Sequence, residues 1–161
     1  MKLCVLTIGR TGRALEPAIA EYEARARRYW SIDIVEVKEE RARRGVSEDA
    51  VREAEGARLL HRLPAGMELV ALTRRGDAWS SERLSRHIQQ SALRSSPGIA
   101  FMIGGAFGLS DTVLKEADRR MRLSTFTLPH DFARLLLLEQ LYRAGTIARG
   151  EPYHKGREPS D

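Results

Sequence analysis

The regular alternation of strand-like and helix-like segments most constrains how this chain can fold. The strand-like segments are short and apolar or alternating, and they cover residues 3–8, 32–37, 67–73, 99–103 and about 122–128. Helical periodicity fills the intervals at residues 14–30, about 48–63, about 81–94, 110–120 and 131–149. Strands that alternate with helices form a mostly parallel sheet covered by helices. The sequence therefore predicts an α/β fold with a sheet of five or six strands.

Length and charge narrow the class of protein further. The chain has 161 residues, which fits a single domain over residues 1–161 with a short C-terminal tail from about residue 150. Its formal net charge is +5, and arginines gather in clusters such as residues 25–28, 41–44 and 74–75. Guanidinium groups suit phosphate, so a nucleic-acid partner is one interpretation. A solvated basic surface is an equally good one.

Several kinds of site are disfavoured by composition. Cys4 is the only cysteine, which excludes an intramolecular disulfide and a thiolate metal site. The four histidines, His61, His87, His130 and His154, lack metal-ligand spacing, so no metal is expected. No apolar run approaches the roughly 18 residues needed to span a bilayer, and the N-terminus does not resemble a signal peptide. We expect a cytoplasmic protein with no membrane partner.

Two turns near the centre of the chain mark a candidate pocket. Residues 104–110 are glycine-rich and follow the apolar strand at 99–103, and residues 123–130 precede the last helix. Glycine lets the backbone approach a ligand closely, because no Cβ stands in the way. In parallel sheets ligands bind at the carboxyl ends of the strands, where both turns and Leu72 are expected. The sequence therefore predicts one pocket shared by the two turns.

The last helix is apolar around most of its circumference. Leu135, Leu136, Leu137, Leu138 and Leu141 do not share a single face. Such a helix must be buried on several sides. A homodimer joined through this helix is our preferred interpretation, and burial within one chain is the alternative.

Four motifs, in order, resemble the RlmH family. They are Ile103-Gly104-Gly105-x-x-Gly108-Leu109, Thr127-Leu128-Pro129-His130, Leu138-Glu139-Gln140-Leu141-Tyr142-Arg143-Ala144 and Pro152-Tyr153-His154-Lys155. That family contains the large-subunit ribosomal RNA pseudouridine N3-methyltransferases of the SPOUT (α/β-knot) superfamily. The resemblance extends over essentially the whole chain.

The resemblance implies a C-terminal deep trefoil knot and S-adenosylmethionine as the methyl donor. Carried over to this sequence, the cofactor contacts would be Leu72, Gly104, Leu123, Ser124, Thr125, Phe126, Thr127 and Leu128. Neutral main-chain groups suit the adenine edge, and two leucine side chains suit its faces. The implied partner is large-subunit ribosomal RNA within an assembled ribosome.

Methyl transfer to an imide nitrogen requires in-line alignment and a freed lone pair. His154 is the favoured general base, Tyr153 would stack on the nucleobase, and Arg143 would hold the developing anion or a phosphate. His130 is a further catalytic candidate, although it could instead cap the last helix. Two other functions stay open: a SPOUT methyltransferase acting on another RNA such as tRNA, and a non-catalytic RNA-binding factor in ribosome assembly.

Overall fold

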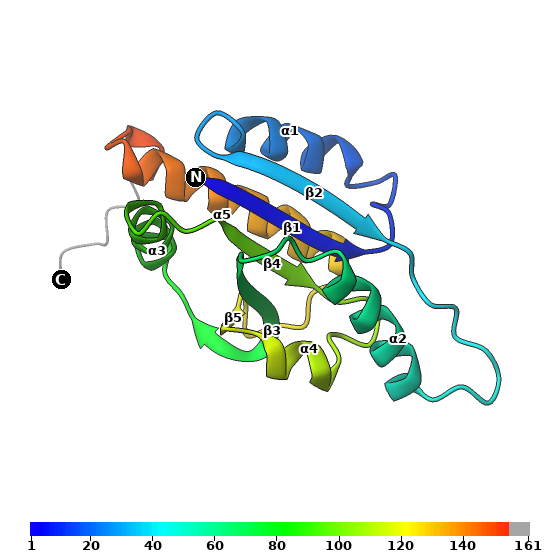
Figure 1. Cartoon of the computed structure of the whole chain (residues 1–161). Helices are drawn as coiled ribbons and strands as arrows, with labels where there is room; N and C mark the ends of the chain where they lie inside the picture. Colours follow the sequence, from blue (N-terminus) through cyan, green and yellow to red (C-terminus); the bar gives the residue numbers. More distant parts are fainter. Residues whose placement is uncertain (155–161) are drawn as a thin grey trace.

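The computed structural model describes residues 1–154, and for His154 it describes the backbone alone. Its elements follow one another in the alternating order that the sequence predicts (Figure 1). They are β1 (Lys2–Ile8), α1 (Glu16–Ala26), β2 (Ser31–Val37), α2 (Glu48–His61), β3 (Glu68–Ala78), α3 (Ser81–Leu93), β4 (Ile99–Ile103), α4 (Asp111–Glu116), β5 (Arg119–Arg122), α5 (His130–Ala148) and the 3₁₀ turn η1 (Pro152–His154).

The five strands form one parallel sheet in the order β2-β1-β4-β3-β5. The central strands β1 and β4 pair in register, with Leu3 opposite Ile99 and Val5 opposite Phe101. Both strands are covered on two faces, which explains why they are continuous apolar runs rather than alternating ones. The predicted α/β fold with a parallel sheet is confirmed. The trefoil knot stays a prediction.

Helices cover the two faces of the sheet separately. Helix α5 lies on one face between α1 and α3, and α2 and α4 lie on the other (Figure 1). Successive residues of β1 therefore enter different cores. Leu3 and Val5 pack with Leu137 and Leu141 of α5, whereas Leu6 packs on the α2 side.

Most of the apolar surface of α5 is covered by the chain itself. Leu137, Leu138 and Leu141 are fully buried, and the indole N–H of Trp30 donates a 2.8 Å hydrogen bond to the carbonyl of Leu141. Phe132 stays 51% exposed on the outer side of the helix. The breadth of the apolar surface is therefore largely explained by α1, α3 and the sheet, and the homodimer stays a prediction.

Three predicted boundaries are wrong. The fifth strand lies at Arg119–Arg122, and residues 123–128 form a loop instead of a strand. The preceding helix ends at Glu116 instead of about residue 120. Strand β3 does not stop at residue 73 but continues to Ala78 after a register shift. Tertiary packing is the reason, because buried Met121 anchors β5 beside β3, and a Cβ on Gly76 would lie 2.6 Å from the Met121 nitrogen.

Serine side chains cap the N-termini of three helices. Ser47 Oγ accepts the backbone N–H of Ala50 at 3.1 Å, and Ser80 rather than Ser81 caps α3. Ser110 caps α4. None of the helices within residues 1–154 is both long and apolar enough to cross a membrane.

Candidate functional site

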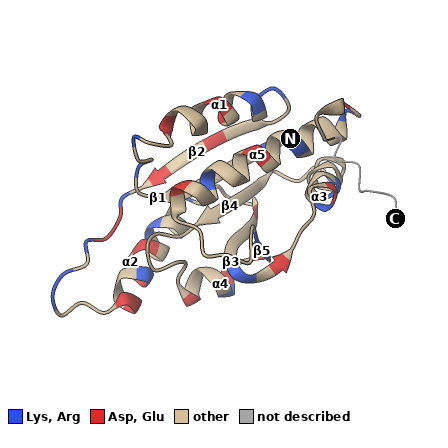
Figure 2. Cartoon of the chain, turned by 180° about the vertical axis from the view of Figure 1, so that it is seen from behind, with Lys and Arg blue, Asp and Glu red and all other residues tan. Residues whose placement is uncertain are grey.

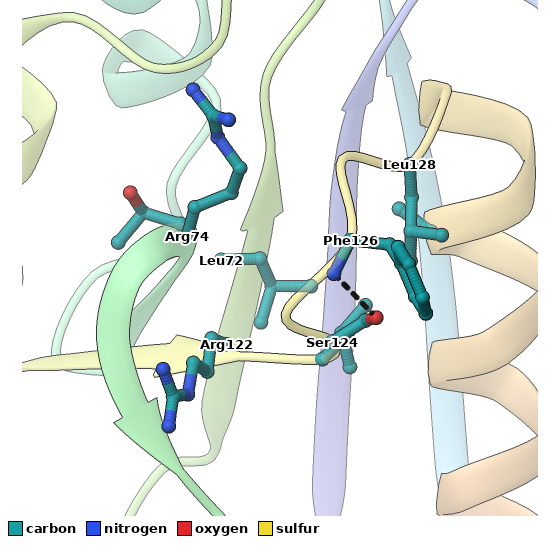
Figure 3. Close-up of a pocket in the computed structure, with 9 residues that line it drawn as sticks. Leu72, Arg74, Arg122, Ser124, Phe126 and Leu128 are labelled. Atoms are coloured by element: carbon teal, nitrogen blue, oxygen red, sulfur yellow. Dashed lines mark hydrogen bonds between the residues drawn. The ribbon is translucent and has the colours of Figure 1, made fainter.

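A cavity of about 90 Å³ lies where the loop at residues 123–129 passes the middle of β3. Its walls come from β3, from the end of β5, from this loop and from the first turn of α5. The lining residues are Leu72, Thr73, Arg74, Arg122, Leu123, Ser124, Phe126, Leu128 and Ala133. Leu72 points from β3 toward the loop, and Phe126 and Leu128 lie on the side of α5 (Figure 3).

Local hydrogen bonds shape this loop. The backbone N–H of Phe126 donates to Ser124 Oγ at 3.0 Å, which forms a tight Ser turn (Figure 3). Arg74 Nη1 donates to Thr127 Oγ1 at 3.0 Å and thereby joins β3 to the loop. The chain reaches α5 through Pro129, whose fixed φ suits the residue before a helix. The loop is thus joined to β3 by a hydrogen bond and continues directly into α5.

The structure brings together most of the predicted cofactor residues. Five of the eight line this cavity, namely Leu72, Leu123, Ser124, Phe126 and Leu128. Thr125 and Thr127 belong to the same loop but are exposed and do not line it. Sequence reasoning missed the other four lining residues, Thr73, Arg74, Arg122 and Ala133. A signal for the two arginines existed, since each stands within two residues of a predicted contact.

Gly104 lies outside the lining of the cavity, in a turn that needs glycine for its own backbone. A Cβ at Gly104 would lie 2.4 Å from the carbonyl carbon of Gly108 and 2.6 Å from the nitrogen of Leu109. The turn closes through a 3.0 Å hydrogen bond from the Gly108 N–H to the Gly105 carbonyl. A packing reason for Gly104 therefore exists without any ligand, and its role as a cofactor contact stays a prediction.

The residues of the cavity fit an adenosyl group. Leu72 and Leu128 offer apolar faces, and the loop backbone between them offers neutral hydrogen-bonding groups. Arg74 and Arg122 offer positive charge to a carboxylate. The volume is below the roughly 300 Å³ of the smallest typical ligand sites. A bound cofactor would therefore extend past the rim or displace the loop outward.

Two of the catalytic candidates, Tyr153 and Arg143, meet at Glu139. The phenolic O–H of Tyr153 donates to Glu139 Oε1 at 3.2 Å, and Arg143 Nε donates to the same oxygen at 3.1 Å. The Arg143 guanidinium also lies 5.0 Å from the centre of the Tyr153 ring. Burial, followed by hydrogen bonding to Tyr22, raises the pKa of Tyr153 to about 12. Tyr153 therefore stays neutral in this position near pH 7.

His154 belongs to η1, but its side chain and residues 155–161 lie outside the described part of the chain. His130 is the first residue of α5. Its Nε2 lies 2.9 Å from Asp131 Oδ1, and Asp131 Oδ2 accepts the Gly12 N–H at 2.8 Å. The N-cap position belongs to Pro129, with no side-chain capping bond. The alternative that His130 caps this helix is therefore wrong.

The cavity and the Glu139 cluster do not meet within one chain. Ala133 lines the cavity and Arg143 lies ten residues further along α5, about 15 Å at 1.5 Å per residue. Within residues 1–154, no three His, Cys, Asp or Glu side chains gather as metal ligands.

Comparison with known proteins agrees with this arrangement. Residues 1–154 match the family described as "Predicted SPOUT methyltransferase". The chain is 49% identical over 156 residues to a Gemmatimonas aurantiaca protein named ribosomal RNA large subunit methyltransferase H, covering 96% of this chain and 100% of that protein. A Syntrophotalea carbinolica protein of the same name is 46% identical over 155 residues, covering 96% and 99%.

Solved structures with low sequence identity share the fold. A Legionella pneumophila methyltransferase in complex with bound SAM superposes with a TM-score of 0.51 at 13% identity, covering 90% of this chain and 67% of that one. A Bordetella pertussis methyltransferase gives a TM-score of 0.52 at 17% identity, covering 88% and 95%. From the match along residues 1–154 and the near full-length relatives, this chain belongs to the SPOUT methyltransferase family.

Proposed function

We propose that this protein transfers a methyl group from S-adenosylmethionine to N3 of a pseudouridine in large-subunit ribosomal RNA. The observation that carries the proposal is the cavity in which five of the predicted cofactor residues meet. Relatives that are 49% and 46% identical are named for methylation of this RNA, which supports the substrate. Action on the assembled ribosome, in the cytoplasm, is part of the proposal.

The chain's own residues would divide the work between binding and proton transfer. Bound S-adenosylmethionine supplies an electrophilic methyl group on a sulfonium. Leu72 and Leu128 would hold the adenine faces, and the loop backbone would bind its polar edge. His154 would accept the N3 proton, and Tyr153 would stack on the base. Arg143 would stabilise the developing anion once its guanidinium leaves the Glu139 carboxylate and binds the substrate.

A homodimer would bring the two separated groups together. In a two-fold dimer the same surface of α5 meets itself, and antiparallel α5 helices place the C-terminal half of one beside the N-terminal half of the other. Phe132 and Phe126 are 51% and 79% exposed, close to the cavity, and are available for such an interface. We propose that Tyr153 and His154 of one subunit serve the cavity of its partner.

The cofactor site can be tested with a substitution that fills the cavity from the first turn of α5. Ala133→Leu adds bulk from the first turn of α5, whereas Ala20→Leu makes the same change on the exposed side of α1. We expect calorimetry to show S-adenosylmethionine binding for the wild type and Ala20→Leu, with affinity at least about tenfold weaker for Ala133→Leu. Equal affinities in all three proteins would place the cofactor elsewhere.

The reaction itself is tested by mapping modified nucleosides. Unmethylated ribosomes are incubated with the protein and labelled S-adenosylmethionine, and the large-subunit RNA is digested and analysed by mass. A single labelled N3-methylpseudouridine is expected. Label found in tRNA instead would show another substrate class, and cofactor binding without any methylation would favour an assembly factor.

A further inference from the structure

A second cavity, of about 350 Å³, lies beside the candidate cofactor cavity at the β5 edge of the sheet. It is formed by the outer half of β3, the start of α3 and the strand β5. Four arginines dominate its lining, Arg75, Arg83, Arg119 and Arg120, with Trp79 among them. We call these five residues the arginine cleft. Figure 2 shows Lys and Arg positions side by side on β3 and β5, at the lower edge of the sheet.

Two of these arginines are held in place by side chains and backbone of neighbouring elements. Arg119 Nε lies 2.5 Å from Glu68 Oε1, and the other oxygen of Glu68 is 2.8 Å from His87 Nε2 on α3. Arg120 donates from Nε and Nη2 to the carbonyl of Leu114, at 3.1 and 2.7 Å. A site with preset cations loses less side-chain freedom when an anion binds.

Trp79 orders a third arginine. The Arg83 guanidinium lies 4.8 Å from the centre of the Trp79 ring, and His87 contacts the same ring edge-on at 5.0 Å. Stacking of a guanidinium on an aromatic ring leaves its N–H edge free for phosphate oxygens. In Arg83 this edge makes two long hydrogen bonds, both at 3.4 Å, from Nη1 to the Ala78 carbonyl and from Nη2 to Asp77 Oδ2.

The positive charge of the cleft is only partly neutralised. Asp118 Oδ2 accepts the Leu69 N–H at 2.7 Å, so part of its capacity is used by the sheet. The side chain of Arg75 makes no hydrogen bond or ion pair with any residue from 1 to 154, and Arg120 binds a carbonyl only. Two exposed cations thus remain without a carboxylate.

Cationic residues connect the cleft to the cofactor cavity. Arg74 precedes Arg75 on β3, and Arg122 lies two residues beyond Arg120, on the same face of β5; both line the cofactor cavity. The arginine of α1 differs, because Arg25 is paired with Glu21 one turn away. Arginines without a carboxylate partner therefore extend from the cleft to the candidate cofactor cavity.

We infer that the arginine cleft binds the phosphate backbone of the substrate RNA and thereby positions the target nucleotide at the cofactor cavity. The inference rests on the proposed function, since it assigns an RNA contact surface to the same site. A continuous phosphate chain explains why arginines that lack a carboxylate partner line both the cleft and the cofactor cavity. The alternative is that these charges only prevent the edge strand β5 from pairing with another sheet. That role would not require arginines that extend from β5 to the cofactor cavity.

The test compares two double variants of equal charge. Arg75→Gln/Arg120→Gln removes the two cations without a carboxylate, and Arg28→Gln/Arg94→Gln removes two exposed cations elsewhere on the protein. Arg75→Gln alone serves as a variant that loses no internal bond. Binding of protein-free large-subunit RNA is measured over a range of salt concentrations, together with S-adenosylmethionine affinity by calorimetry.

The cleft variant should bind RNA about tenfold more weakly near 0.1 M salt, with Arg75→Gln intermediate. The slope of log K against log salt should fall by about 1.4–1.8, because each lost phosphate contact contributes 0.7–0.9. S-adenosylmethionine affinity should stay unchanged, and the control variant should match the wild type in slope.

Each contrary result has a distinct meaning. Equal RNA affinity of the cleft and control variants, with wild-type methylation intact, would overturn the inference and leave the proposed function standing. If the cleft variant bound ribosomes more weakly but free RNA normally, the cleft would contact a ribosomal protein, and the inference would also be overturned. A wild-type protein that neither binds nor methylates the RNA would refute the proposed function itself.

Discussion

Gly104 offers a clear test of whether the glycine turn is built for its own backbone. Adding a methyl group by Gly104→Ala would place Cβ 2.4 Å from the Gly108 carbonyl carbon, and 2.6 Å from both its oxygen and the Leu109 nitrogen. All three are backbone atoms, so no side-chain rotation can relieve the overlap. Overpacking of this kind costs about 1–3 kcal/mol, and the rigid neighbours favour the upper half of that range.

A loss of about 2–3 kcal/mol in a domain of this size lowers Tm by about 4–12 °C. Gly108 supplies the matched control, because a Cβ there meets nothing within 4 Å and only its φ of +82° resists substitution. Asparagine tolerates positive φ better than alanine. Gly108→Asn should therefore be milder than Gly108→Ala, whereas Gly104→Asn should be as damaging as Gly104→Ala.

Thermal unfolding followed by circular dichroism measures all four variants. A Gly104→Ala protein with wild-type Tm would refute the packing argument and return Gly104 to a role in ligand contact alone. A substitution at Gly104 cannot test cofactor binding separately from the fold, because the added atoms would overlap backbone atoms of the turn. Ala133→Leu is the cleaner substitution for that purpose, because it acts from the wall of the cavity.

Further predictions address ionisation, catalysis and assembly. Glu55 is 4% exposed, and burial raises the pKa of its carboxyl above the value of 4.5 expected in the unfolded chain. The free energy of unfolding therefore falls as pH rises from 4.5 through the higher pKa of the folded state. Glu55→Gln should therefore raise Tm at pH 7 but not near pH 4, while Glu53→Gln changes little at either pH. His154→Ala should slow methylation by about 10²–10⁴, less at high pH if His154 is the general base. A pH-independent loss would indicate RNA positioning. Removing residues 152–161 should abolish methylation but spare cofactor binding and the dimer, and full activity of the shortened protein would contradict this. Phe132→Asp should sediment as a folded monomer, and an unchanged dimer would exclude this face of α5.

Local patterns in the sequence were sufficient for the fold class. Short apolar runs such as residues 3–8 and 99–103 are stable in the middle of a parallel sheet that is covered by helices on both faces. These runs, alternating with helical segments, therefore predicted the layers of the α/β fold. The N-terminus of α2 is likewise a local matter, because Ser47 before an acidic first turn satisfies a free backbone N–H without any distant partner. The order of the four motifs was enough to suggest the family.

Interactions between distant segments decided what the sequence could not. Residues 119–122 became the edge strand because Met121 is buried beside β3, although residues 123–128 carry the stronger local strand pattern. The breadth of the apolar surface on α5 suggested a partner, yet α1 and α3 cover most of it. The arginine cleft joins Arg75, Trp79 and Arg83 to Arg119 and Arg120, which only the pairing of β3 with β5 brings together. Sequence patterns determine which face of an element is apolar, but the neighbour that covers that face, and the charges that meet beside it, follow from tertiary packing.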